Sequence, residues 1–187
     1  MTMRVIRPLP RLNNSFMKNM SSSFSFSTLN STNYVDTHCH PDKILQLYNN
    51  KNKTSHPSFT DLRLKSKDCF PENYEACLAV ACATTSFEPI KTLMQQDDSV
   101  YGTFGIHPHY ADTYTSQVET QLLEIYSKLP KVVAWGEIGL DYFKNHCPAN
   151  IQKEVFEKQL HHAIDLDLPV VIHTREVEFP IDFLSIL

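Results

Sequence analysis

The sequence of 187 residues contains no apolar run near the ~18 residues that a membrane-spanning helix needs, so we expect no membrane partner. It also lacks an excess of positive charge, because 17 Lys and Arg residues stand against 21 Asp and Glu residues and the net charge is -4. This balance argues against a broad basic surface that binds nucleic acid by charge alone. It leaves open an enzyme that contacts phosphate through bound metal ions, because the ions then supply the positive charge.

The cysteines contain no C-x-x-C pair and are odd in number: Cys39, Cys69, Cys77, Cys82 and Cys147. A chain of this size is not a small secreted scaffold held together by disulfides, so we interpret them as reduced thiols in a reducing compartment. This interpretation indicates a cytoplasmic or nuclear location. Hydrophobic residues at 42% and charged residues at 20% are ordinary proportions for a globular domain.

Acidic residues are absent from the first 34 positions, where three arginines and one lysine accompany the hydroxyl-rich stretch SSSFSFSTLNST. An acid-free N-terminus that contains Arg and Ser is typical of a mitochondrial transit peptide. Two early prolines would interrupt the helix that such a peptide needs, so a disordered extension without a targeting role is an equal alternative. We exclude residues 1–33 from the fold and expect a single domain from 34 to 187.

Five short apolar runs follow, separated by segments of helix or loop length. Continuous rather than alternating hydrophobicity is typical of strands covered on both faces, as in parallel sheets. The segment before the last run is an amphipathic helix, because apolar residues recur at three- and four-residue steps from Ile151 to Ile164. We therefore predict βα units, with a polar surface insertion at 49–72. The predicted strands cover 34–39, 76–83, 99–106, 131–138 and 168–174.

Histidine or glutamate occurs near the carboxyl end of four of these runs. In a βα-barrel the carboxyl ends of all strands meet at one face, which is where active sites lie. Residues i and i+2 of a strand share a face, so His38 and His40 can point at one ion while Cys39 points away into the packing. The residues at these strand ends are His38, His40, His107, His109, Glu137 and His173.

Imidazoles together with a carboxylate are the ligand set of a catalytic zinc, manganese or similar ion, which acidifies bound water. Taken alone, one such histidine is more often a hydrogen-bonded surface residue, and Glu137 alone is more often a solvated carboxylate. The four strand ends together favour a metal site. The remaining histidines are interpreted as structural or surface residues: His56, His146, His161 and His162.

From about residue 34 onward the chain resembles the TatD family of metal-dependent hydrolases, through the motifs VDTHCH, GIHPH, GEIGLDY, FEKQLHHAIDLDLPVVIHTR and DFLSIL in this order. The resemblance implies an α/β fold of the TIM-type (β/α) barrel class. It also implies a hydrolase that uses divalent metal ions, two in number and Mg²⁺, Mn²⁺ or Zn²⁺ in identity. Such enzymes are commonly deoxyribonucleases, so DNA is the implied substrate and its phosphodiester bonds are cut by metal-activated water.

The resemblance also assigns roles to individual residues. His38 and His40 would bind the first metal, Glu137 would bridge to a second metal, and His173 would bind that second metal. His107 would line the pocket near the scissile phosphate, which makes His107 and Glu137 the candidate catalytic residues. Arg175 follows His173 by two positions and is our own candidate for a phosphate contact beside His107.

The family pattern contains two metal-binding residues that this sequence lacks. One is a His on a sixth strand, usually in a motif like H-C-F-S-G, and the other is an Asp on a later strand, in a motif like T-D. The sequence stops at Leu187 with about five of eight strands, so we expect an incomplete barrel. Its first and fifth strands would expose edges that favour self-association. The alternative to an active nuclease is a catalytically impaired truncated isoform or fragment.

Overall fold

The computed structural model describes residues 4–6, 33–52, 58–65, 70, 72–144 and 146–177. Four features of the sequence interpretation fall outside these ranges: most of the N-terminal extension, His56, Cys69 and the DFLSIL motif. A targeting role for the extension therefore stays a prediction.

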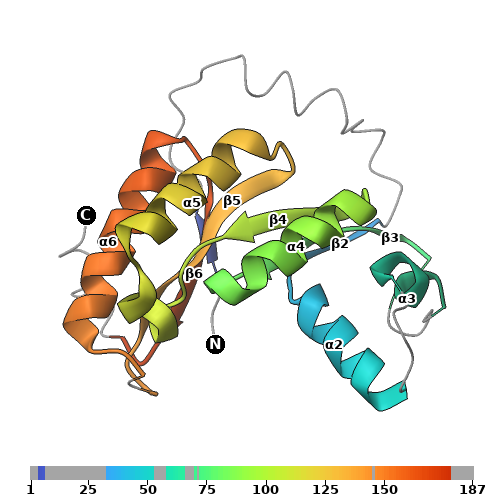
Figure 1. The fold of residues 1–187 in the computed structure, drawn as a ribbon, viewed down its shortest axis with the longest axis horizontal. Coiled ribbons are helices and arrows are strands. Elements are labelled where there is room, and N and C mark those ends of the chain that lie inside the picture. The colour runs from blue at the N-terminus through green and yellow to red at the C-terminus, as the bar shows by residue number, and fades with distance from the viewer. Residues whose placement is uncertain are drawn as a thin grey trace.

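A six-stranded sheet forms the centre of the fold, in the order β1-β6-β5-β4-β3-β2 (Figure 1). Strands β2 to β6 are all parallel, and strands that follow one another in the sequence are neighbours in space. This sequential winding is the arrangement of a (β/α) barrel, whereas a doubly wound sheet reverses its strand order. The expected incomplete barrel with five parallel strands is confirmed. The parallel strands are β2 (Tyr34–Cys39), β3 (Tyr74–Ala81), β4 (Val100–Phe104), β5 (Val132–Asp141) and β6 (Val170–Arg175).

The sixth strand, β1 (Arg4–Ile6), comes from the N-terminal extension and pairs antiparallel with β6. It differs from the expectation that all of residues 1–33 lies outside the fold. Because β1 pairs with Val170–Ile172, it covers part of the β6 edge that was expected to be open. Strand β2 has β3 as its single partner among the described residues. Self-association through the β2 edge stays a prediction.

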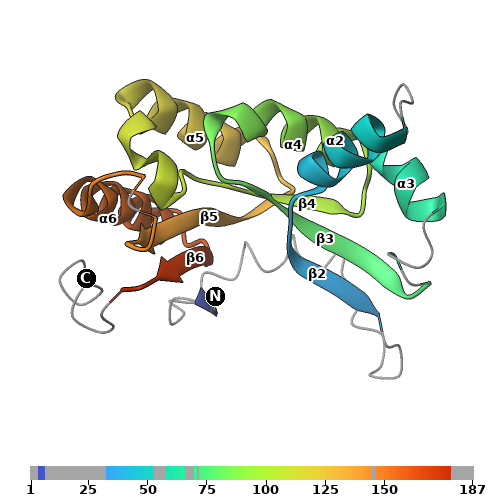
Figure 2. The ribbon, with the colours of Figure 1, turned by 90° about the horizontal axis from the view of Figure 1, so that it is seen from below.

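Helices connect the strands, and α2, α4 and α5 lie over one face of the sheet (Figure 2). The helix expected before the last strand is present as α6, which includes the whole of the amphipathic stretch. Within the described part of the chain, no helix is both long enough and apolar enough to cross a membrane. The helices are α2 (Pro41–Asn52), α3 (Phe59–Lys65), α4 (Thr84–Gln96), the 3₁₀ helix η1 (Pro108–Thr113), α5 (Ser116–Lys128) and α6 (Ala149–Asp165).

The segment 49–72 is more ordered than a polar surface insertion, because it contains the end of α2 and the whole of α3. Phe59 and Leu62 place the apolar side of α3 against the core, with exposed fractions of 2% and 4%. The ring of Phe59 also meets the ring of Phe70 edge to face, with centroids 5.6 Å apart. Part of this segment therefore packs on the domain.

The core lies between the sheet and its helices, with Trp135 of β5 fully buried in it. The indole stacks on the ring of Tyr126 from α5, with centroids 4.2 Å apart. The Tyr126 hydroxyl accepts a hydrogen bond from the backbone N–H of Phe104 at 3.1 Å and donates to the carbonyl of Ala134 at 2.8 Å. These contacts fix α5 against the strands that carry the candidate site.

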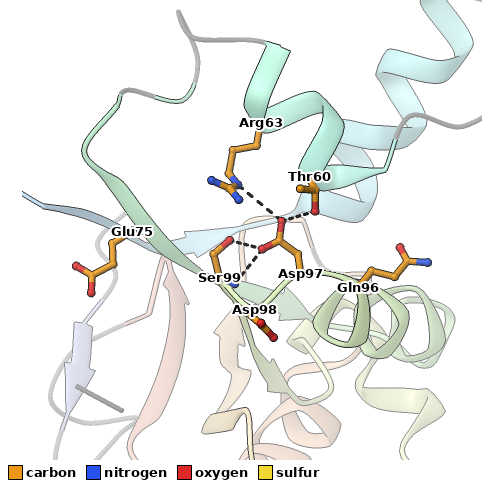
Figure 3. A pocket seen from close by; sticks show the side chains of 7 residues that line it. All are labelled: Thr60, Arg63, Glu75, Gln96, Asp97, Asp98 and Ser99. Atoms are coloured by element: carbon orange, nitrogen blue, oxygen red, sulfur yellow. Dashed lines mark hydrogen bonds and ion pairs between the residues drawn. The ribbon is translucent and has the colours of Figure 1, made fainter. Parts of the chain in front are cut away.

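A polar pocket lies at the amino ends of β3 and β4 (Figure 3). At its centre the buried Asp97 accepts hydrogen bonds from Thr60 Oγ1 at 2.7 Å and Ser99 Oγ at 2.6 Å, and Arg63 Nε lies 3.7 Å from the carboxylate. The cluster ties α3 to the connection between α4 and β4. Because the strands are parallel, this pocket lies at the opposite end of the sheet from the histidines expected to bind metal.

Candidate metal centre

The side chains expected to bind metal converge at the carboxyl ends of the strands. They form two groups, and within each group the candidate ligand atoms lie within 4.8 Å of one another. Glu137 belongs to both groups and is 3% exposed. The residues are His38, His40 and Glu137 in the first group, and His107, Glu137 and His173 in the second.

Two glycines in β5 determine where Glu137 points. Gly136 and Gly139 both have φ of +146°, a conformation that side-chain-bearing residues rarely adopt. A Cβ atom on Gly136 would lie 2.5 Å from the carbonyl oxygen of Val171, and one on Gly139 would lie 1.9 Å from that of His173. The pairing of β5 with β6 shifts register between Gly136 and Ile138, so Glu137 is the unpaired residue of a bulge. Such a bulge re-aims a side chain, here towards the histidines.

His38 lies near the end of β2 and His40 directly follows the strand, with their ring centroids 5.2 Å apart. The Nδ1 atom of His40 lies 3.1 Å from the carbonyl oxygen of Val80. Since a carbonyl only accepts, Nδ1 carries the proton, which leaves the lone pair of Nε2 available to a metal. The Nε2 atom of His38 lies 3.8 Å from Glu137 Oε2, and the buried Nδ1 atom of His38 has no hydrogen-bond partner. Burial is the main cause that lowers the pKa of His38, which favours the neutral, metal-binding form.

Both ring nitrogens of His173 face carboxylates. Nδ1 lies 3.2 Å from Glu137 Oε1, and Nε2 lies 3.0 Å from Asp141 Oδ2. Burial alone would lower the pKa of His173, but the hydrogen bonds to the two carboxylates raise it above its usual value. Burial likewise opposes ionisation of the carboxyls, yet hydrogen bonds from the histidines lower the pKa of Glu137 and bring the pKa of Asp141 to about 2. Two ionised carboxylates are thus joined through one imidazole.

His107 lies beside His173 and accepts a hydrogen bond on its ring. Its Nδ1 atom accepts the backbone N–H of His109 at 3.1 Å. Burial, with a further contribution from the neighbouring His173, lowers the pKa of His107 to about 3, so the ring is neutral at physiological pH. A neutral imidazole carries a single proton, which lies on Nε2 when Nδ1 accepts. A proton on Nε2 suits a hydrogen bond to an anion better than it suits metal ligation.

The donor set fits divalent ions. Imidazole nitrogens and a carboxylate are ligands that zinc, manganese and similar ions take, and Glu137 can offer one oxygen to each group. Divalent metal use is therefore supported by the residues that are present.

The sequence matches the family model described as TatD related DNase over residues 35–187. The chain belongs to the TatD-related DNase family. It is 37% identical over 147 residues to the human 3'-5' RNA nuclease TATDN2, an alignment that covers 78% of this chain and 18% of that protein. It is 42% identical over 94 residues to the 3'-5' ssDNA/RNA exonuclease TatD of Rahnella sp. (strain Y9602), covering 50% of this chain and 35% of that protein.

A solved TatD homologue from Escherichia coli, YJJV, superposes with a TM-score of 0.59 at 26% identity and covers 76% of this chain and 51% of that one. A TatD family hydrolase from Entamoeba histolytica gives a TM-score of 0.62 at 17% identity, a likeness of fold alone. This TatD-family chain thus spans less than half the length of the two curated relatives and about half the length of the solved structures.

Two buried glutamines of α6 hold the site-bearing backbone of this TatD-family chain. Gln159 accepts from the N–H of Ile106 at 2.8 Å and donates to its carbonyl at 3.0 Å, directly before His107. Gln152 accepts from the N–H of Asp141 at 2.8 Å and donates to its carbonyl at 3.0 Å. Sequence reasoning missed both glutamines and Asp141. Their positions could have revealed the glutamines, because they stand seven residues apart and so lie on the apolar side of the helix.

The other predicted polar residues lie around this centre with different partners. Arg175 is exposed, and its guanidinium carbon lies 3.7 Å from the ring centroid of Phe143. Its role as a phosphate contact stays a prediction. The ring centroid of His146 lies 4.7 Å from that of His109. On α6, Nε2 of His162 lies 2.5 Å from Oε1 of Glu119. The interpretation of His162 as structural agrees with this pairing.

Proposed function

We propose that this chain acts as a divalent-metal-dependent hydrolase that cleaves phosphodiester bonds in nucleic acid, with single-stranded DNA as the first substrate to test. The observation that supports this most directly is the position of Glu137, whose carboxylate is shared by two groups of candidate ligands. Two ions held a short distance apart by a shared carboxylate are a known arrangement for phosphodiester cleavage. The relatives named as DNA and RNA nucleases support the same class of substrate.

His38, His40 and Glu137 would hold one ion, and Glu137 with His173 would hold a second; Mg²⁺, Mn²⁺ and Zn²⁺ are the candidates. Bound ions of this kind make hydroxide available near neutral pH and offset phosphate charge. His40 is oriented for this task by its hydrogen bond to Val80, and His173 by its hydrogen bond to Asp141.

His107 supplies a neutral N–H donor beside these residues, with its ring centroid 4.3 Å from that of His173. A neutral imidazole with its proton on Nε2 can donate to a phosphate oxygen, and its protonation is constant across the physiological pH range. We therefore assign His107 to the non-bridging oxygen of the scissile phosphate. The negative net charge of -4 is compatible with this scheme, because ions rather than surface lysines would meet the phosphate.

The test is an assay of nucleotide release from end-labelled single-stranded DNA, duplex DNA and RNA, run in EDTA and in each of the three ions. We expect release from at least one substrate to require an ion, and His38→Ala to reduce it to the EDTA background. His161→Ala is the matched control, because His161 is exposed on α6 and belongs to neither ligand group. Absence of ion-dependent release from every substrate would refute the proposal. If the wild-type chain binds ions without cleaving, the alternative of a catalytically impaired chain is supported instead.

A further inference from the structure

Asp141 is fully buried at the end of β5 and belongs to neither group of candidate ligands. Its Oδ2 atom lies 2.8 Å from His109 Nε2 and 3.0 Å from His173 Nε2. Its Oδ1 atom accepts the backbone N–H groups of Phe143 at 3.1 Å and Lys144 at 3.3 Å. Among the described residues, each hydrogen-bond partner of these two oxygens is a nitrogen that can donate.

This environment decides which nitrogen of His173 carries a permanent proton. A carboxylate can only accept, so the His173 nitrogen that faces Asp141 must be protonated. The opposite nitrogen, Nδ1, also faces a carboxylate, that of Glu137, but Glu137 belongs to both ligand groups, so a bound ion would take the place of the proton between these two side chains. We propose that Asp141 is a positioning residue that keeps the proton of His173 on Nε2 and so makes Nδ1 its metal-binding atom.

The proposal rests on the proposed metal-dependent function, and it assigns to Asp141 a role that the motif resemblance did not. The same carboxylate holds His109 through the same oxygen, so the two rings are kept in one fixed relation. Gln152 in turn holds the backbone of Asp141 on both its N–H and its carbonyl. A carboxylate whose side chain and backbone are both held by hydrogen bonds can fix the orientation and the tautomer of a metal-binding histidine, as in carboxylate–histidine–metal triads.

A purely structural role is the competing explanation, because Oδ1 also closes the turn after β5. Asp141→Asn separates the two roles, since an amide has the same shape with one accepting and one donating end. If its NH₂ group faces the histidines, His173 must accept there and its proton moves to Nδ1. If its NH₂ group faces the turn, it meets the donors of Phe143 and Lys144. The turn offers only backbone N–H groups, which cannot accept, whereas an imidazole nitrogen can, so we expect the NH₂ group of the Asp141→Asn variant to face the histidines.

Two measurements on the full chain test the proposal, with Zn²⁺ alone as the probe. The first is Zn²⁺ affinity by calorimetry, where we expect Asp141→Asn to bind about 10- to 100-fold more weakly than the wild type. Asp165→Asn, at an exposed position of α6, is the matched control and should bind as the wild type does. The second is ¹⁵N NMR of histidine-labelled wild-type protein, in which Zn²⁺-loaded His173 should show a protonated Nε2 and a ligated Nδ1.

The NMR measurement needs no variant at Asp141, so it remains decisive if Asp141→Asn does not fold. Zn²⁺ ligation of His173 through Nε2 would overturn the positioning role. So would an unchanged Zn²⁺ affinity of Asp141→Asn, even with a lower melting temperature, because that result fits a structural role alone. Both outcomes leave the proposed function standing. Failure of the wild type to bind Zn²⁺ would overturn the proposed metal site and the role of Asp141 together.

Discussion

Replacing Gln159 by Leu should destabilise the whole domain, although Gln159 lies on a helix and its hydrogen bonds go to Ile106 rather than to a candidate metal ligand. The side chain is 1% exposed, and its amide pairs with both the N–H and the carbonyl of Ile106, itself 1% exposed. Leu has a similar size and no polar atoms. The substitution therefore removes two hydrogen bonds and leaves two buried backbone groups without partners.

The magnitude follows from those two groups. Each buried backbone group left unpaired costs about 1–3 kcal/mol, and the apolar side chain of Leu offsets part of the sum. We expect a loss of about 2–4 kcal/mol in the free energy of unfolding, a large share of the ~5–15 kcal/mol that stabilises a typical domain. Gln152→Leu should behave similarly, because Gln152 pairs with the N–H and the carbonyl of Asp141 in the same way.

Urea unfolding followed by tryptophan fluorescence measures this loss, since the chain has a single tryptophan, Trp135, which is fully buried. The midpoint should fall while the slope stays constant. Gln121→Leu makes the same chemical change at an exposed position of α5 and should alter stability by no more than ~0.5 kcal/mol. A Gln159→Leu protein as stable as the Gln121→Leu control would show that α6 does not hold the backbone before His107.

Three further outcomes are expected. Gly139→Ala should lower the melting temperature by at least about 4 °C in circular dichroism, because it forces a side chain into a left-handed conformation and against the carbonyl of His173; an unchanged melt would contradict the close approach. Burial opposes ionisation of Asp97, but hydrogen bonds from Ser99 and Thr60 lower its pKa overall. The stability that the ionised carboxylate adds is therefore present above the pKa of Asp97 in the unfolded chain, and it is lost as the pH falls through the pKa in the folded chain. The difference in unfolding free energy between wild type and Asp97→Asn should therefore shrink as the pH falls below about 5, and a constant difference would refute this. Arg175→Ala should raise KM about tenfold with little change in kcat if its guanidinium binds substrate phosphate, and an unchanged KM would leave Arg175 with its contact to Phe143 alone.

The part of the site that follows from strand positions could be predicted from the sequence. His38 and His40 stand two residues apart at the end of β2, and the parallel order brings Glu137 and His173 to the same end of the sheet. Apolar runs located all five parallel strands to within a few residues. These features are local, or follow from a rule that applies to every sheet of this class.

Asp141 could not be predicted because its position depends on how far β5 continues. The apolar run stops near Ile138, whereas the strand extends to Asp141 through a bulge that two glycines permit. Bulges change which side chains share a face, so counting along the strand from Glu137 does not give the direction of Asp141. The short strand β1 was missed for a related reason: three residues paired with β6 carry too little pattern to stand out from an extension.

The glutamines of α6 show that a polar residue within an apolar stripe can hold the backbone of a neighbouring strand end. Gln152 and Gln159 occupy the same stripe as Val155, Phe156 and Ala163, and all five are buried. A buried amide is stable only when both its ends are paired, and a backbone N–H with the carbonyl of the same residue satisfies both. Such a backbone pair becomes available where a strand leaves its ladder of hydrogen bonds, which in parallel βα units is the end that carries the active site. A glutamine in the apolar stripe of a βα helix is therefore a sequence signal for the strand ends it holds, and here it points to Ile106 and Asp141.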